Sequence, residues 1–278
     1  MMPGSFNGLV GRAVADHGFK ATYVSGAALT AGAGVPDIGL LTLDQFCNSI
    51  NDIYMGSNLP IIADADTGFG EGEMCAKTVW SYNRAGAAGM HMEDQVFPKR
   101  CGHLDGKSLV SVTDFQKKVQ ICAQARDACS NGDFIICARS DAKGVEGLQA
   151  TIDRSKAYID AGADMIFPEG LTSLKEFEEV ANALRAHKSD IFLLANMTEF
   201  GKTPIIPFED FEKVGYSCVI YPVSTLRVAM QAVNSFLSDL KSTGSAQPQL
   251  EKMLTRQELY DLLEYKPGVE WIYPKPKK

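Results

Sequence analysis

NRAGAAGMHMED, residues 83–94, repeats its pattern in IDAGADMIFPE, residues 159–169. Each stretch begins as the end of a helix, passes through a glycine of the kind that caps helices, and enters a short apolar strand. Each strand then ends on a carboxylate, Glu93 in the first stretch and Glu169 in the second. A recurring unit of helix, cap, strand and polar strand end is typical of βα units stacked around a parallel sheet.

Short apolar runs extend this pattern over most of the chain. We expect strands over residues 21–25, 60–66, 89–94, 134–141, 164–169, 191–196 and 218–222, and a short first strand at Met2–Gly4. Amphipathic helices are expected between them, such as Val112–Cys129 and Leu174–Ala186. The sequence therefore predicts an α/β protein with a (β/α)8 barrel over residues 1–240, whose short first strand could leave the barrel incompletely closed. A doubly wound open sheet is the alternative, but no GxGxxG motif follows a strand.

The composition changes after Leu237. The stretch KSTGSAQP, residues 241–248, has the composition of a linker. Thr255 and Glu258 then have the spacing of a capping box, which predicts a helix that runs to about Tyr265. We expect residues 241–278 to form a linker and a helical tail that docks on another surface.

The bulk composition excludes several classes of protein. The chain has 27 Lys and Arg against 34 Asp and Glu, a net charge of −7, and no run of like charges, which argues against a nucleic-acid partner. Its seven cysteines are scattered and form no C-x-x-C pair, which indicates a reducing compartment. No apolar run reaches the roughly 20 residues that span a bilayer, and the first residues lack a secretory signal. We expect a cytoplasmic protein without a membrane partner, although a removed organellar transit peptide would leave no trace.

Ionisable and hydrogen-bonding residues gather at the carboxyl ends of six consecutive predicted strands. In a parallel barrel these ends open on one mouth, where the catalytic residues of such barrels lie. The residues are Tyr23, Ser25, Asp64, Asp66, Glu93, Asp94, Arg139, Asp141, Glu169, Asn196 and Thr198.

The stretch DADTGFG, residues 64–70, is a candidate metal site. Asp64 and Asp66 are two positions apart in an extended segment, so they project from the same face, and Glu93 comes from the next strand. Three hard oxygen donors suit Mg²⁺ or Mn²⁺. The alternative is that Asp66 caps a turn and Asp64 pairs with Arg139. His91 is expected to be a satisfied interior group rather than a ligand.

The stretch KRCGH, residues 99–103, is a candidate thiol site. Lys99, Arg100 and His103 would lower the pKa of Cys101 and attract the carboxylates of a substrate. The glycines and proline around them suit a loop that closes over a site. The alternative, a cysteine that serves as a small buried apolar residue, is disfavoured among three basic neighbours.

These motifs resemble those of the isocitrate lyase / phosphoenolpyruvate mutase superfamily, and within it those of the 2-methylisocitrate lyases. The resemblance covers about Pro3 to Tyr265. It rests on YVSG (23–26), PDIG (36–39), DADTGFG (64–70), KRCGH (99–103), ARSDA (138–142), FPE (167–169) and NMTEFG (196–201).

The resemblance implies a barrel whose last helix is exchanged with a neighbouring subunit in a homotetramer, a dimer of dimers. It also implies that Asp64 and Asp66 hold Mg²⁺ and that Glu93 holds metal-bound water. The implied catalytic residues are Cys101, Tyr23, Arg139 and Glu93, with Tyr23 near the substrate hydroxyl. The implied substrate contacts are Ser25, Gly26, Asp37, Arg100, Gly102, His103, Glu169, Asn196 and Thr198.

The reaction that this resemblance implies is the cleavage of a small 2-hydroxy polycarboxylate. For 2-methylisocitrate the products are pyruvate and succinate, with Cys101 protonating the departing carbanion and Tyr23 or a carboxylate of the metal site as the base. Cleavage of oxaloacetate or 2,3-dimethylmalate is the alternative within the superfamily. A non-catalytic barrel that acts as a binding protein is the alternative from another class.

Overall fold

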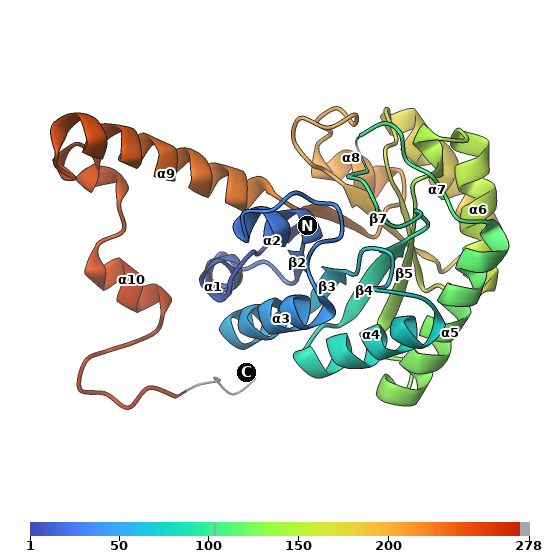
Figure 1. Ribbon diagram of the computed structural model, residues 1–278, viewed down its shortest axis with the longest axis horizontal. Coiled ribbons are helices and arrows are strands. Elements are labelled where there is room, and N and C mark those ends of the chain that lie inside the picture. The colour runs from blue at the N-terminus through green and yellow to red at the C-terminus, as the bar shows by residue number, and fades with distance from the viewer. Residues whose placement is uncertain (103, 273–278) are drawn as a thin grey trace.

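The computed structural model describes residues 1–102 and 104–272. Eight parallel strands form one sheet in the order β1-β8-β7-β6-β5-β4-β3-β2, with helices around its outside (Figure 1). This confirms the predicted (β/α)8 barrel, and no predicted strand is missing. The strands are β1 (Met2–Pro3), β2 (Thr22–Val24), β3 (Ile61–Asp64), β4 (Gly89–Glu93), β5 (Ile135–Ser140), β6 (Met165–Pro168), β7 (Phe192–Asn196) and β8 (Cys218–Tyr221).

The helices alternate with these strands along the chain, as the periodicity predicts. They are α1 (Gly8–Asp16), α2 (Gly26–Gly32), α3 (Leu43–Ser57), α4 (Gly72–Ala85), α5 (Val112–Ser130), α6 (Leu148–Asp160), α7 (Leu174–His187), α8 (Phe208–Lys213), α9 (Ser224–Thr243) and α10 (Arg256–Leu262), with 3-10 turns η1 (Ala142–Gly144) and η2 (Gln247–Lys252). The glycines of the two repeated stretches follow α4 and α6. Gly86 and Gly162 have φ values of 101° and 106°, the left-handed conformation that glycine adopts without strain.

The short first strand does close the barrel. Met2 pairs with Ile220 of β8, and on the other side a single bridge joins Gly4 to Tyr23 of β2. The Ser5 N–H donates to the carbonyl of Tyr23 at 2.8 Å as part of this bridge. A Cβ on Gly4 would lie 2.1 Å from the carbonyl oxygen of Pro222, so this close junction requires glycine.

Two apolar cores hold the barrel together. The larger one lies between the sheet and the surrounding helices. The smaller one fills the barrel interior, which is a packed core and not a pore. Its buried residues are Met2, Tyr23, Ile62, Cys137, Met165, Phe167, Leu194 and Ile220.

The C-terminal segment forms an arm. Helix α9 leaves the barrel and projects away from it, and η2 and α10 follow at its far end (Figure 1). Its base is tied to the barrel by a hydrogen bond of 2.6 Å from Thr225 to the carbonyl of Gly4 and by an ion pair of 2.8 Å between Arg227 and Glu199. None of the twenty residues of α9 is buried. The predicted capping box at Thr255 is present, and the helix that it starts is short.

Within the described ranges, no helix combines the length and the apolar character needed to cross a membrane.

Candidate active site

Three acidic residues lie buried at the carboxyl ends of β3 and β4. Asp64 ends β3, Asp66 follows it in a turn, and Glu93 ends β4; each is exposed by 4% or less. One oxygen of Asp64 accepts a hydrogen bond from the Gly26 N–H and the other from the Asp66 N–H, both at 3.0 Å. A Cβ on Gly26 would lie 2.8 Å from the Asp64 carboxylate. The neighbouring Ser25 caps α2, with its hydroxyl accepting from Ala28. The start of α2 therefore holds Asp64 in place.

Lys99 reaches into this acidic cluster. Its ammonium lies 2.8 Å from Asp66 and 2.6 Å from Asp37, and its side chain is 2% exposed. Burial lowers the pKa of Lys99, but the surrounding carboxylates, Glu93 foremost, raise it overall. Lys99 was expected to flank the thiol of Cys101, whereas the structure directs its charge to the acidic residues.

The pKa values of the three acids respond to this environment in different directions. Burial raises the pKa of Glu93 well above its ordinary value, and neither of its oxygens accepts a hydrogen bond. Burial and the nearby charge of Asp64 raise the pKa of Asp66 to about 6. For Asp64, burial also acts to raise the pKa, but His91, Lys99 and Arg139 outweigh it and lower the pKa. Carboxylates buried without full compensation favour a cation in their midst.

The donor set fits Mg²⁺. The two oxygens of Glu93 are buried and lack hydrogen bonds, and Asp64 and Asp66 supply further hard oxygens beside it. In the described part of the chain, no three or more Cys, His or acidic side chains are close enough together to form a protein-only site that could hold a metal ion. Mg²⁺ does not need one, because it commonly binds through one or two carboxylates and keeps several waters.

Arg139, at the end of β5, is held by carboxylates other than Asp64. Its guanidinium donates two hydrogen bonds to Asp141, at 3.0 and 3.2 Å, and lies 3.4 Å from Glu93 and 3.8 Å from Glu169. Among the described residues, no ion pair joins Arg139 to Asp64, so the alternative pairing considered from the sequence is not the one that forms. Asn196 donates at 3.1 Å to the same oxygen of Glu169 that lies near Arg139. Strands β4 to β7 thus contribute to one polar cluster.

The sequence places Asp141 among the polar strand ends but assigns it no catalytic, substrate-binding or metal-binding role, although its spacing from Arg139 contains a signal. Asp141 follows Arg139 by two residues at the end of the same strand, which places both side chains on one face. Asp141 is fully buried and also accepts a hydrogen bond from Lys107 at 3.0 Å. Thr198, at the end of β7, is buried as well.

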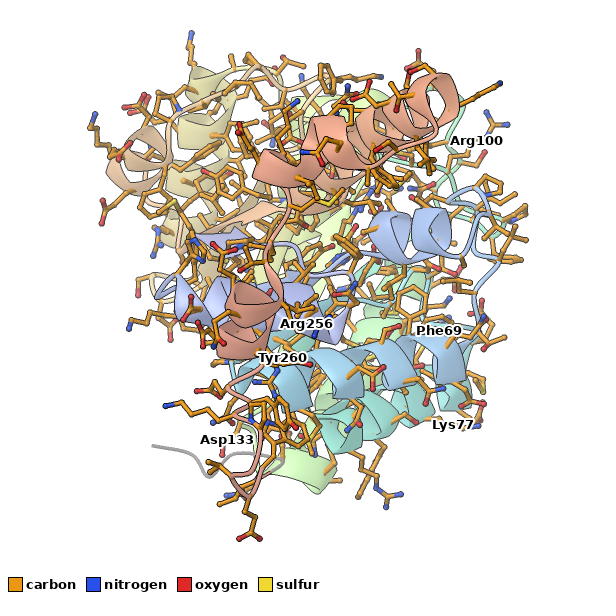
Figure 2. All side chains as sticks on the ribbon, turned by 90° about the vertical axis from the view of Figure 1, so that its left-hand side faces the viewer. Phe69, Lys77, Arg100, Asp133, Arg256 and Tyr260 are labelled. Atoms are coloured by element: carbon orange, nitrogen blue, oxygen red, sulfur yellow. The ribbon has the colours of Figure 1, made fainter. Side chains whose placement is uncertain are left out.

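The loop that carries Cys101 lies against the Arg139 cluster. A Cβ on Gly102 would be 2.4 Å from a guanidinium nitrogen of Arg139 and 2.5 Å from Cγ of Glu169, so the backbone of the loop approaches both side chains closely. Cys101 is half-buried. Arg100 is exposed and donates to the carbonyl of Asp105 at 3.2 Å, and Figure 2 shows it at the outer edge of the molecule. His103 lies outside the described residues.

Tyr23 and His91 form a pair inside the barrel below the acids. The Tyr23 hydroxyl and the His91 ring are hydrogen bonded at 2.6 Å, and His91 lies 3.7 Å from Asp64. Burial lowers the pKa of His91 to about 4, so its ring is neutral at pH 7. Burial and the charge of Asp64 raise the pKa of Tyr23 well above its ordinary value, which disfavours the phenolate. His91 is an interior group, as the sequence predicts.

Comparisons with known proteins give consistent matches. Residues 1–241 match the family model described as phosphoenolpyruvate phosphomutase. The chain is 46% identical over 264 residues to the probable 2-methylisocitrate lyase 1 of Corynebacterium glutamicum, covering 95% of this chain and 84% of that protein. It is 45% identical over 263 residues to the 2-methylisocitrate lyase of Aeropyrum pernix, and the match covers 95% of this chain and 82% of that protein.

Solved structures with the same fold include several enzymes. The crystal structure of 2,3-dimethylmalate lyase matches with a TM-score of 0.86 and 36% identity, covering 94% of this chain and 85% of that one. Oxaloacetate acetylhydrolase in complex with 3,3-difluorooxalacetate matches with a TM-score of 0.87 and 33% identity, covering 94% of this chain and 86% of that one. Phosphonopyruvate hydrolase, in a complex with oxalate and Mg²⁺, matches with a TM-score of 0.83 and 27% identity, covering 95% of this chain and 89% of that one.

The raised pKa of Asp66 predicts a pH dependence of stability in the metal-free protein. The pKa is about 6 in the folded protein against 3.8 for the ordinary group, so the folded state binds more protons between these values. The free energy of unfolding therefore falls as the pH rises from about 4 to about 6, by on the order of 2 kcal/mol, and levels off above that.

Urea denaturation in EDTA, from pH 4 to pH 7.5, measures this effect in the wild type and in Asp66→Asn, which has no proton to release. The stability of Asp66→Asn relative to the wild type should rise over this range. A difference between the two proteins that stays constant with pH contradicts the prediction.

Proposed function

Because the chain belongs to the phosphoenolpyruvate mutase / isocitrate lyase superfamily, we propose that it is a magnesium-dependent carbon–carbon lyase that cleaves 2-methylisocitrate to pyruvate and succinate. One observation carries this proposal: the buried, unbonded oxygens of Glu93 lie beside Arg139, against which the Cys101 loop rests. A cation site, an anion-binding guanidinium and a proton-carrying thiol therefore meet at one barrel mouth.

Asp64, Asp66 and Glu93 are the residues that would hold Mg²⁺. When bound, the ion supplies a Lewis acid that stabilises negative charge on the oxygens of a 2-hydroxy acid. Arg139 binds a substrate carboxylate, and Asp141 and Glu169 fix its orientation through the contacts described above.

Proton transfers at two atoms complete the cleavage. Glu93, one of the carboxylates at the metal site, accepts the proton of the substrate hydroxyl, because the raised pKa of Tyr23 disfavours a phenolate base. The electrons of the hydroxyl O–H bond form the carbonyl of pyruvate as the carbon–carbon bond breaks. The electron pair of the broken carbon–carbon bond stays on the carbon of the departing fragment. Cys101 protonates this carbon, and succinate forms.

Sequence identity favours 2-methylisocitrate as the substrate over 2,3-dimethylmalate and oxaloacetate. The chain shares 45–46% identity with the two 2-methylisocitrate lyases, against 36% and 33% with the 2,3-dimethylmalate lyase and oxaloacetate acetylhydrolase structures. The similar proteins argue against a binding protein without catalysis, because those reported above are named as lyases or as hydrolases.

The arm supports a further part of the proposal, that the protein is a homotetramer in which arms are exchanged between subunits. Helix α9 and η2 line an apolar groove that no other described segment of the chain fills. An apolar surface of this kind is typical of subunit interfaces. The exposed apolar residues of α9 and η2, in this groove and beside it, include Val228, Met230, Val233, Leu237, Leu240, Leu250 and Met253. Residues 241–278 would then be the part of the arm that docks on the neighbouring subunit.

A cytoplasmic location completes the proposal. No disulfide joins the cysteines of the described residues, although seven are present, and this suits a reducing compartment.

The substrate assignment is tested with a panel of 2-methylisocitrate, isocitrate, oxaloacetate and 2,3-dimethylmalate. We expect the highest kcat/KM with 2-methylisocitrate, measured as pyruvate release, with loss of turnover in EDTA and recovery on adding Mg²⁺. A folded sample that turns over none of the four compounds would contradict the lyase function and favour a binding protein.

Cys101→Ser tests the proton donor. We expect kcat to fall by about 10²- to 10⁴-fold, because a serine hydroxyl is a far weaker acid than a thiol. Cys129→Ser, which changes another half-buried cysteine, on α5 and away from the barrel mouth, is the matched control and should keep full activity. Full turnover by Cys101→Ser would remove the thiol from the mechanism.

Charges placed on the apolar stripe of α9 test the assembly. We expect Val233→Glu combined with Leu237→Glu to convert the tetramer to smaller species in sedimentation equilibrium, because both side chains are exposed and apolar and lie four positions apart on one face of α9. Ser238→Glu adds a charge to the same helix at an exposed polar position and serves as the control. A variant that remains tetrameric with both charges present contradicts the proposed interface.

A further inference from the structure

The loop that carries Cys101 is held by hydrogen bonds at two places among its described residues, 96–102 and 104–109. At its base, Gln95 forms a bridge with Leu109, and the side chain of Gln95 binds both the N–H and the carbonyl of Arg100. Beyond this point, the backbone at Gly102 is held by a different residue. Lys107 donates a hydrogen bond to the Gly102 carbonyl, directly after Cys101.

Lys107 is buried, and its ammonium has a second partner. It donates to Asp141 at 3.0 Å, while the side chains of Lys107 and Asp141 are 3% and 0% exposed. The turn η1 covers it from one side, since a Cβ on Gly144 would lie 3.7 Å from the end of the lysine side chain. Burying an ammonium is costly unless it is paired, so these two contacts define where Lys107 can lie.

Asp141 connects Lys107 to Arg139. One oxygen of Asp141 accepts from both Lys107 and Arg139, and the other accepts from Arg139 alone. A single buried carboxylate therefore fixes the guanidinium and, through Lys107, the backbone next to Cys101. Asp141 is not one of the carboxylates that we assign to the metal, so this connection does not depend on the metal site.

We propose that Lys107 is a positioning residue that latches the Cys101 loop, residues 96–109, onto Asp141 and so holds the thiol in a fixed relation to Arg139. The consequence for catalysis rests on the proposed function, because it requires Cys101 to be the proton donor. The latch itself rests on the contacts of Lys107 alone.

Removal of the Lys107 ammonium favours an open loop. In the closed position the Gly102 carbonyl and one Asp141 oxygen lose a charged donor while they remain buried, whereas in an open loop water replaces it. The loss of this donor raises the free energy of the closed state but not that of the open state, so the population of open loops rises.

Trypsin cleavage after Arg100 measures loop opening. The Arg100 backbone is hydrogen bonded to Gln95 in the closed loop, so cleavage requires the loop to open. We expect Lys107→Met to be cleaved after Arg100 at least fivefold faster than the wild type. Lys117→Met, which removes an exposed lysine on α5, is the matched control and should match the wild type. Cleavage after Arg84 on α4 should be the same in all three proteins, which excludes general unfolding.

Steady-state kinetics provide the second readout. We expect kcat of Lys107→Met to fall at least fivefold with a smaller change in KM, because the substrate still binds but the thiol reaches it less often. If Lys107→Met does not fold, Lys107→Gln, which keeps a hydrogen-bond donor without the charge, is subject to the same criteria.

The outcomes separate the latch from the proposed function. A rise of less than fivefold in cleavage after Arg100 overturns the latch, whatever the activity. Faster cleavage in Lys107→Met, together with a wild type that turns over no substrate, supports the latch and overturns the proposed function alone.

Discussion

Burial of opposite charges at the barrel mouth is the interaction on which the rest of the site depends. Five of the buried carboxylates surround the site, those of Asp64, Asp66, Glu93, Asp141 and Glu169, together with three buried cations, those of Lys99, Lys107 and Arg139. Each charge is costly to bury alone, so each is positioned by its partners. The carboxylates outnumber the cations, and this negative excess is centred on Glu93, which accepts no hydrogen bond. A divalent cation at this point would offset it.

Glycine allows these charges to come together. Gly26 brings the start of α2 against Asp64, and Gly102 brings the thiol loop against Arg139 and Glu169; a Cβ at either position would meet a charged side chain at 2.8 Å or less. Gly26 is the first residue of α2, whereas Gly102 lies in the loop that follows β4. The site is therefore assembled by backbone approach as well as by its charged side chains.

The barrel and the arm differ in whether their apolar residues are buried. The barrel buries both of its cores within one chain and closes through Gly4 and Tyr23, even though its first strand has two residues. In the part of the chain that the structure describes, α9 exposes apolar residues and none of its residues is buried. This exposed apolar surface is the reason that we connect the arm with assembly.

The sequence by itself determined the strands, their polar ends and the acidic cluster, because these follow from local periodicity and from the common direction of parallel strands. Asp64, Asp66 and Glu93 lie where that direction requires. Only the tertiary structure decided the directions of the loop side chains. Lys99 and Arg100 are adjacent, yet Lys99 turns inward to Asp66 and Arg100 outward to solvent. Lys107 meets Asp141 across 34 positions of sequence. Such contacts depend on how distant elements pack, and no local pattern encodes them.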